Sequence, residues 1–411
     1  MKRVVIVGAG VIGITTALEL QRRGRAVQVL DRDGVAAGAS AGNAGAFAFA
    51  EIEPLATPGI LRKAPRWLLD PLGPLSVPPA YALKIAPWLW RFWRASRAQN
   101  YQHALAAQAG LMQLSSVALD RLIPFAGVQD MVQNDGQLQL YESEAAFRAS
   151  LPGWEQRRRH GIAFTLLEHP EAIAEIQPGL SPRFTHAGFT PDWINTADPK
   201  AWVETLAKVF QDKGGQIDRR EVCALSVSDQ AAQVHTTDGT IAADSVVLAA
   251  GAWSHYLARG MGDHIPLETE RGYNTTLPAG AFDLRTHLTF SDHGFVASRI
   301  NGGVRIGGAV ELGGLDMPAN FKRADVMLTK ARDFLPGLKA EGGQQWMGFR
   351  PSLPDSLPVI GAASRSDRVI YAFGHGHLGL TQSAGTAELV AALIDRQPPP
   401  ISLAPFAPTR F

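Results

Sequence analysis

Three glycines near the N-terminus have the spacing of a site for a dinucleotide diphosphate. Gly8, Gly10 and Gly13 form a G-x-G-x-x-G pattern between a short β-branched run and a segment with helical periodicity. The first glycine permits a tight turn, the second lets the backbone approach the diphosphate, and the third lets helix and strand pack closely. The diphosphate would then meet the free N–H groups and the dipole of a helix N-terminus. Asp31, which follows Gly13 by 18 residues, is placed to accept hydrogen bonds from a ribose.

A second glycine-rich segment near the C-terminus favours FAD over NAD. The fingerprint and its acidic residue suit either dinucleotide, and a glycine turn without a ligand is the alternative interpretation. Residues 374–381 join a strand to a helix through three glycines, and Ala249-Ala250-Gly251 closes another buried strand. A second helix N-terminus at the same cleft would stabilise the negative charge of a reduced flavin.

An arginine within an apolar, proline-rich stretch is the candidate substrate anchor. Arg350 lies in a Gly-Phe-Arg-Pro sequence, and its planar fork matches a carboxylate in bidentate fashion. A buried guanidinium needs a partner, which is either a substrate carboxylate or a structural acid such as Asp355. Tyr273 either donates its hydroxyl to the same carboxylate, or closes the pocket, or is a core tyrosine with its hydroxyl satisfied. His375 and His377 have no nearby Cys or acidic ligand, so we expect no metal site and place them beside the flavin.

The composition indicates which kinds of binding partner and which cellular compartment suit the chain. Lys plus Arg (39) nearly balances Asp plus Glu (38), so no global field draws the chain to nucleic acid. The single cysteine, Cys223, excludes internal disulfides and suits a reducing cytoplasm. No stretch approaches the ~18 apolar residues that would span a membrane. Residues 85–97, however, interleave tryptophans with arginines, which indicates either a helix at the inner membrane surface or a helix packed on the protein.

The pattern of elements predicts an α/β fold with two interleaved domains. Residues 3–8 and 26–31 read as buried parallel strands, residues 34–50 as a close-packed loop of small residues, and Asn134 to Gly136 as a hairpin turn. We expect a Rossmann-like FAD-binding domain interleaved with a smaller α+β substrate domain built on an antiparallel sheet. The expected boundaries are 1–50, 190–262 and 341–411 for the FAD-binding domain, and 51–189 and 263–340 for the substrate domain.

The chain resembles the family of FAD-dependent D-amino-acid oxidases and dehydrogenases, which includes glycine and sarcosine oxidases. The resemblance covers nearly the full length. It rests on VVIVGAGVIG with LDRD, on ASAGNAG (39–45), on VVLAAGAWS (246–254), on WMGFRPSLPDSLPVIG (346–361) and on FGHGHLGLTQSAGTAELVAALI (373–394). ASAGNAG and the Arg-Gly-Tyr at 271–273 make it most similar to the bacterial D-amino-acid dehydrogenase branch.

The resemblance implies the positions that bind each ligand. Arg350 would hold the substrate carboxylate, with Tyr273 and His377 as further candidate catalytic residues. The implied FAD-binding residues are Gly8, Gly10, Val11, Ile12, Gly13, Asp31, Arg32, Ser40, Gly42, Asn43, Ala44, Gly45, Ala46, Val222, Ala250, Gly251, Trp253, Gly374, Gly376, His377, Leu378, Gly379, Leu380 and Thr381. No cysteine lies where some relatives tether their flavin, which implies non-covalent FAD. His377 stands where glycine oxidases have an arginine, so glycine is not the expected substrate.

The implied reaction is oxidative deamination in D-amino acid catabolism. The α-carbon hydride would pass to flavin N5, and the resulting imine would hydrolyse to a 2-oxo acid and ammonia. The protein's main task is then to hold the α-hydrogen in place. A secondary-amine oxidase or dehydrogenase acting on D-proline, hydroxyproline or sarcosine is an alternative, as is an electron-relay flavoprotein subunit of a complex. Either oxygen or a quinone would accept the electrons.

Overall fold

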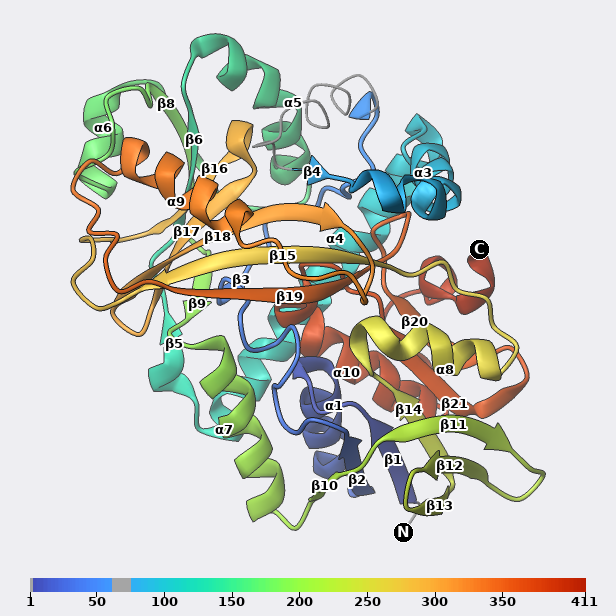
Figure 1. The fold of residues 1–411 in the computed structure, drawn as a ribbon. Coiled ribbons are helices and arrows are strands. Elements are labelled where there is room, and N and C mark those ends of the chain that lie inside the picture. The colour runs from blue at the N-terminus through green and yellow to red at the C-terminus, as the bar shows by residue number, and fades with distance from the viewer. Residues whose placement is uncertain (1–2, 61–74) are drawn as a thin grey trace.

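The computed structural model describes residues 3–60 and 75–411, and a six-stranded sheet contains both the first and the last strands of the chain (Figure 1). Its order is β10-β2-β1-β14-β21-β20, and all neighbours are parallel except β20 and β21. The strands are β1 (Arg3–Val7), β2 (Ala26–Asp31), β10 (Gln216–Arg219), β14 (Ser245–Leu248), β20 (Val359–Ala363) and β21 (Ser366–Phe373). Side chains alternate across a strand, so Val4 and Ile6 enter one hydrophobic core and Val5 and Val7 enter another. The predicted burial of this strand on both faces is confirmed.

Helices cover one face of the six-stranded sheet. They are α1 (Val11–Arg22), α7 (Pro199–Asp212), α10 (Gly379–Asp395) and, packed on α10, α4 (Ala98–Ala126). The predicted start of α7 is confirmed, because the Asp198 carboxylate accepts the N–H groups of Lys200 at 2.8 Å and Ala201 at 3.1 Å. The other face carries a three-stranded sheet of β11 (Val222–Val227), β12 (Ala232–Thr236) and β13 (Gly239–Ala243), together with α8 (Ser254–Gly260).

A nine-stranded, mainly antiparallel sheet forms the second large unit. Its path is β19-β15-β18-β17-β16-β6-β8-β7, and the short β4 also pairs with β18. The strands are β4 (Leu75–Ser76), β6 (Gln137–Tyr141), β7 (Thr165–Leu167), β8 (His186–Thr190), β15 (Glu268–Leu277), β16 (His287–Phe290), β17 (Phe295–Ile300), β18 (Gly303–Leu312) and β19 (Gln344–Ser352). Helix α9 (Lys322–Phe334) packs on it, and α5 (Glu144–Arg159) and α6 (Pro170–Ile176) lie near β6 to β8. Strands β15 and β19 cross between α9 and the helices α1 and α10 (Figure 1).

The hairpin predicted around Asn134 to Gly136 is wrong. A turn is present, and Gly136 has φ of 69°, but the flanking strands belong to different sheets. Strand β5 (Val132–Gln133) pairs with β9 (Ile194–Thr196), which also pairs with β3 (Ala46–Phe47). The next strand, β6, pairs instead with β8 and β16, which bury its apolar side chains in the large sheet. Burial on both sides of β6 therefore outweighs the local turn signal.

Residues 344–352, which form β19, belong to the antiparallel sheet and not to the parallel sheet that the sequence suggested. The expected boundaries place residues 341–411 with the parallel sheet, whereas β19 forms an edge of the nine-stranded sheet beside β15. Arg350 is therefore carried by the antiparallel sheet and faces the cofactor fold across the interface.

The aromatic segment at 85–97 forms most of α3 (Ala82–Ala95), and its tryptophans differ in exposure. Trp88 is only 8% exposed and packs with Ile85 and Leu312, so of the two interpretations of this segment its indole matches a helix packed on the protein. Trp90 and Trp93 are 53% and 38% exposed. In the described parts of the chain, no helix combines the length and the apolar character needed to cross a bilayer.

Candidate active site

A cavity of about 2110 Å³ lies between the two large sheets. Pockets for drug-sized ligands usually measure about 300–1,000 Å³. The cavity is lined by the glycine fingerprint, the small-residue loop, the 374–381 segment, and one face of β15 and β19. It is therefore roomy enough for an extended dinucleotide and a small substrate together.

The glycine fingerprint has the backbone geometry that close approach requires. Gly8 has φ of 112°, and a Cβ at this position would run into the backbone of Ala249 at the end of β14. A Cβ at Gly13 would overlap the carbonyl oxygen of Gly8, so α1 packs onto β1 only because Gly13 has no side chain. Helix α1 has no side-chain cap and no acidic residue in its first turn. Apart from the Val11 N–H, which the Ser40 hydroxyl accepts, its positive end is thus left open toward the cavity.

Asp31 lines the cavity and also fixes the turn around it. Its Oδ2 accepts the N–H of Ala9 at 2.8 Å, and its Oδ1 accepts those of Asp33 at 2.8 Å and Gly34 at 2.9 Å. A carboxylate has about four acceptor positions, so capacity remains for a ribose hydroxyl. Arg32 stacks beside it over the Trp253 ring at 4.0 Å, and both residues line the same end of the cavity.

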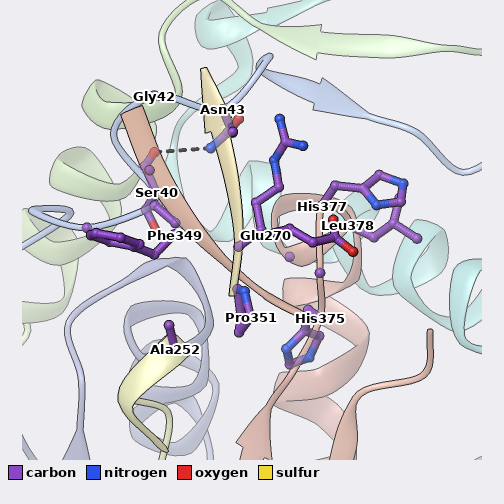
Figure 2. Close-up of a pocket in the computed structure, with 18 of the residues that line it drawn as sticks. Ser40, Gly42, Asn43, Ala252, Glu270, Phe349, Pro351, His375, His377 and Leu378 are labelled. Carbon is purple, nitrogen blue, oxygen red and sulfur yellow. Dashed lines mark hydrogen bonds between the residues drawn. The ribbon is translucent and has the colours of Figure 1, made fainter. Parts of the chain in front are cut away.

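The small-residue loop is braced from both domains. The Ser40 hydroxyl accepts the N–H of Val11 at 3.0 Å, and the Asn43 amide donates to the Ser40 carbonyl at 3.1 Å (Figure 2). From the antiparallel sheet, Asn274 donates to the carbonyl of Gly42 at 2.7 Å and Arg305 donates to that of Asn43 at 2.6 Å. The sequence analysis missed Asn274 and Arg305, which hold the loop against the cavity.

The 374–381 segment supplies the second helix N-terminus. Gly374 and Gly376 have φ of 88° and 54°, and α10 begins at Gly379 without a side-chain cap or an acidic first turn. The Thr381 hydroxyl accepts the N–H of Ala48 at 2.9 Å and so joins this segment to the small-residue loop. Every residue named above as FAD-binding lines the cavity except Gly13 and Gly45, which lie behind it. Gly45 instead packs against the backbone of Thr196 in β9.

The wall opposite these loops is one face of β15 and β19. Cross-strand register pairs Glu270 with Arg350, Gly272 with Gly348, and Asn274 with Trp346. Because side chains alternate along a strand, each pair projects from the same face of the sheet. Neither Glu270 nor Trp346 was singled out from the sequence, and both line the cavity.

Arg350 has no carboxylate partner in the part of the chain that the structure describes. Asp355, the structural alternative, binds Arg410 at 2.7 Å. The Arg350 guanidinium donates a long hydrogen bond to the carbonyl of Gly308 at 3.5 Å. Its side chain lies over Gly272, where a Cβ would come within 2.5 Å of Cζ. Burial lowers the pKa of Arg350, and the Glu270 carboxylate offsets part of that effect, yet a guanidinium stays charged.

Tyr273 also borders the cavity, but its side chain belongs to the opposite face of β15. Its hydroxyl donates to Glu311 at 2.6 Å and accepts the N–H of Asn320 at 3.0 Å, while its ring packs in the core beneath α9. Of the interpretations left open by the sequence, a core tyrosine with a satisfied hydroxyl matches this geometry. Contact with a substrate carboxylate would require the pair with Glu311 to break.

The two histidines of the 374–381 segment have different surroundings. His375 is buried, and its Nε2 lies 2.9 Å from the Thr386 hydroxyl in α10. This hydrogen bond gives His375 a structural role. His377 projects into the cavity (Figure 2). The surrounding cavity wall lowers the pKa of His377 to about 4, although its side chain is exposed to the cavity, and the Arg350 charge contributes, so His377 is neutral near pH 7. Residues 3–60 and 75–411 hold no cluster of histidine, cysteine and acidic side chains suited to a metal ion.

The fold and the cavity are those of a dinucleotide-binding protein, and two helix N-termini face the space that the ligand would occupy. A family model described as FAD dependent oxidoreductase matches residues 3–393, and the chain belongs to this family. It is therefore an oxidoreductase, and its cofactor is FAD.

Curated relatives and solved structures agree with this assignment. The chain is 36% identical to a D-amino-acid oxidase of Bradyrhizobium diazoefficiens, over 100% of this chain and 99% of the relative. It is 31% identical to a D-amino acid dehydrogenase of Neisseria meningitidis serogroup C, over 95% of both chains. Glycine oxidase from Geobacillus kaustophilus has the same fold, with a TM-score of 0.78 at 22% identity over 100% of both chains.

The described residues fit FAD. A Cβ at Gly8 or Gly13 would close the approach to the first helix, and the absence of capping acids at α1 and α10 leaves two positive helix ends facing the cavity. The fingerprint and Asp31 would hold the ADP half, and residues 40–46 with 374–381 would surround the flavin.

Proposed function

We propose that the protein uses FAD to convert D-amino acids to 2-oxo acids and ammonia. The observation that carries the proposal is the Arg350 guanidinium, a charged group on the cavity wall without a carboxylate partner among the described residues. A planar cation in such a position matches a substrate carboxylate. The names of the relatives from Bradyrhizobium and Neisseria support D-amino acids as the substrates.

The roles of the protein residues are binding and positioning. Bound FAD would supply the two-electron oxidation of the amine to an imine, which water then hydrolyses. Arg350 fixes the carboxylate and thereby the direction of the α-hydrogen. His377 is neutral near pH 7, so it lines the site without adding a second positive charge beside Arg350. Asn274 and Arg305 keep the loop at 40–46 in place.

Anaerobic flavin bleaching tests the proposal. Purified holoprotein is mixed with D-amino acids of several side chains, their L-enantiomers, glycine, D-proline and sarcosine, and the absorbance of oxidised flavin is followed. Rapid bleaching by D-amino acids, and slower bleaching by the other compounds, is the expected result. Bleaching by D-proline or sarcosine alone would replace the proposal by secondary-amine oxidation, and no bleaching by any compound would favour an electron-relay subunit.

We expect FAD to be bound without a covalent link. Cys223 lines the cavity beside Val222 and Arg220, on the side of the six-stranded sheet that carries β11, and not in the 374–381 segment. Acid denaturation followed by filtration should therefore release the yellow colour into the filtrate. Colour retained with the polypeptide after denaturation would contradict this expectation.

We propose that the protein is cytoplasmic and that α3 touches the inner face of the cytoplasmic membrane, where a quinone in the bilayer would accept electrons. The exposed side chains Leu83, Trp90 and Trp93 carry this proposal, since Arg94 and Arg97 stack on the two indoles at 4.8 Å each. Replacing all three exposed side chains by serine should abolish co-sedimentation with anionic vesicles. The matched control, Val117→Ser on the exposed face of α4, should sediment like the wild type. A wild-type protein that stays in the supernatant would show that α3 serves only in packing.

A further inference from the structure

A buried carboxylate faces the cavity beside the proposed substrate anchor. Glu270 is only 5% exposed, and its Oε2 has no hydrogen-bond partner within the described residues. It lines the cavity together with His377 and Arg350, and Figure 2 draws it beside His377 and Leu378. Leaving a buried acceptor unsatisfied is costly, and more so for a charged group. Such a group in a cavity wall indicates a ligand that donates to it.

Glu270 and Arg350 are neighbours that do not pair with each other. They are directly opposite in the register of β15 and β19, on the same face of the sheet. Arg350 forms no ion pair with Glu270 or with any other carboxylate in residues 3–60 and 75–411. The guanidinium instead lies over Gly272, whose missing side chain makes that position available. The Glu270 carboxylate and the Arg350 guanidinium therefore border the same cavity without pairing with each other.

This arrangement matches the charges of an α-amino acid. Its carboxylate and its ammonium group are attached to one carbon, so they need a cation and an anion that are close together but not neutralised by each other. We propose that Glu270 binds the α-amino group of the substrate while Arg350 binds the carboxylate. The inference rests on the proposed function and deepens it, because it makes Glu270 the residue that distinguishes amino acids from carboxylic acids lacking the amine.

The electrostatics of the site agree with this role. Burial raises the pKa of the Glu270 carboxyl group, and the charge of Arg350 and, to a smaller extent, the Ser352 hydroxyl offset part of that rise. A bound ammonium would favour the ionised carboxylate further, because an opposite charge within hydrogen-bonding distance lowers the pKa of an acid. In return, the carboxylate orients the amino group, so that both substituents of the α-carbon are fixed and the α-hydrogen has one direction.

A paired-ligand measurement tests the inference. The first ligand is the D-amino acid that bleaches the flavin fastest, with its Kd taken from the concentration dependence of anaerobic reduction. The second is the same acid with hydrogen in place of the amino group, with its Ki taken from competition and from the shift in flavin absorbance. Glu270→Gln should weaken binding of the amino acid by about tenfold or more and leave binding of the amine-free acid nearly unchanged, because the amide removes the negative charge that the ammonium group contacts. Glu270→Asp should recover part of the difference.

The matched control is Glu268→Gln, the same substitution two residues away on β15. The Glu268 carboxylate accepts a hydrogen bond from the Tyr81 hydroxyl at 3.0 Å and does not line the cavity, so this variant should keep the wild-type ratio of Ki to Kd. Equal weakening of both ligands by Glu270→Gln would assign Glu270 to the support of Arg350 and overturn the inference, while the proposed function would stand. If Glu270→Gln weakened the binding of D-lysine or D-arginine alone, the inference would be overturned too, because Glu270 would then recognise a basic side chain and not the α-amino group. A wild type that D-amino acids do not bleach would overturn the proposed function itself.

Discussion

Replacing Arg350 by alanine should weaken substrate binding by one to two powers of ten and slow flavin reduction, with FAD content unchanged. The guanidinium lines the cavity, and no described acid pairs with it, so its removal leaves a substrate carboxylate without a partner. A hydrogen bond to a charged group contributes about 1.5–3 kcal/mol, which corresponds to roughly 10- to 150-fold in affinity. The reduction rate should fall as well, because a misplaced substrate no longer directs its α-hydrogen at the flavin.

Arg350→Lys separates charge from geometry. Lysine keeps the positive charge but has no planar fork, so a bidentate pair becomes a single contact. The variant should therefore lie between the wild type and Arg350→Ala in both Kd and reduction rate. Arg396→Ala is the control, since Arg396 is exposed and pairs with Asp367 outside the cavity. Anaerobic stopped-flow reduction measures both quantities, and wild-type values for Arg350→Ala would show that the anchor is elsewhere. Loss of FAD would instead make Arg350 a structural residue.

The local parts of the fold could be predicted from the sequence because short-range chemistry decides them. The fingerprint at Gly8 to Gly13, the alternation of buried side chains in β1 and the Asp198 cap of α7 each depend on residues within a few positions. Pro199 at the first position of α7 follows the same local preference for proline at a helix start. The glycines of the 374–381 segment were also found because left-handed backbone favours glycine.

The failures have one cause, which is burial against elements distant in the sequence. Asn134 to Gly136 has the residues of a hairpin turn, yet β6 gains more by pairing with β8 and β16. Trp88 belongs to an aromatic and basic stretch, yet Leu312 of β18 and Ile85 cover it. Local composition cannot identify the partner that will cover a side chain.

The missed side of the site did carry a signal in the sequence. Residues 268–277 are ETERGYNTTL, and their cavity face consists of Glu270, Gly272 and Asn274, two residues apart. A polar side chain, a glycine and another polar side chain on a strand are unusual for a face packed on a core. The partner strand could not be identified from this pattern, because the register with β19 joins residues about 80 positions apart. The orientation of Tyr273, which lies between these positions, follows from the same alternation.

Gly13→Ala should reduce FAD affinity by more than tenfold and lower the melting temperature. The added Cβ would overlap the carbonyl oxygen of Gly8, which is backbone and cannot rotate away. Forcing a methyl group into a close-packed contact typically costs about 1–3 kcal/mol, and here α1 must move off β1. When α1 moves, the N–H groups of its first turn move away from the diphosphate. We therefore expect the FAD affinity to fall by more than tenfold, which corresponds to a loss of more than roughly 1.4 kcal/mol of binding free energy. Titration of the apoprotein with FAD, followed by flavin fluorescence, measures the affinity.

The matched control for this substitution is Gly110→Ala in α4, where a Cβ meets nothing within 4 Å. Alanine in a helix interior is favoured over glycine by about 0.5–1 kcal/mol, so this control should be as stable as the wild type or more so. Thermal melts with and without excess FAD separate the two effects of Gly13→Ala. A bound ligand stabilises the folded state in proportion to the logarithm of its concentration over Kd, so the melting temperature of the variant should respond less to FAD. An equal response in variant and wild type would mean that the lost stability comes from packing alone, and that Gly13 has no part in holding the cofactor.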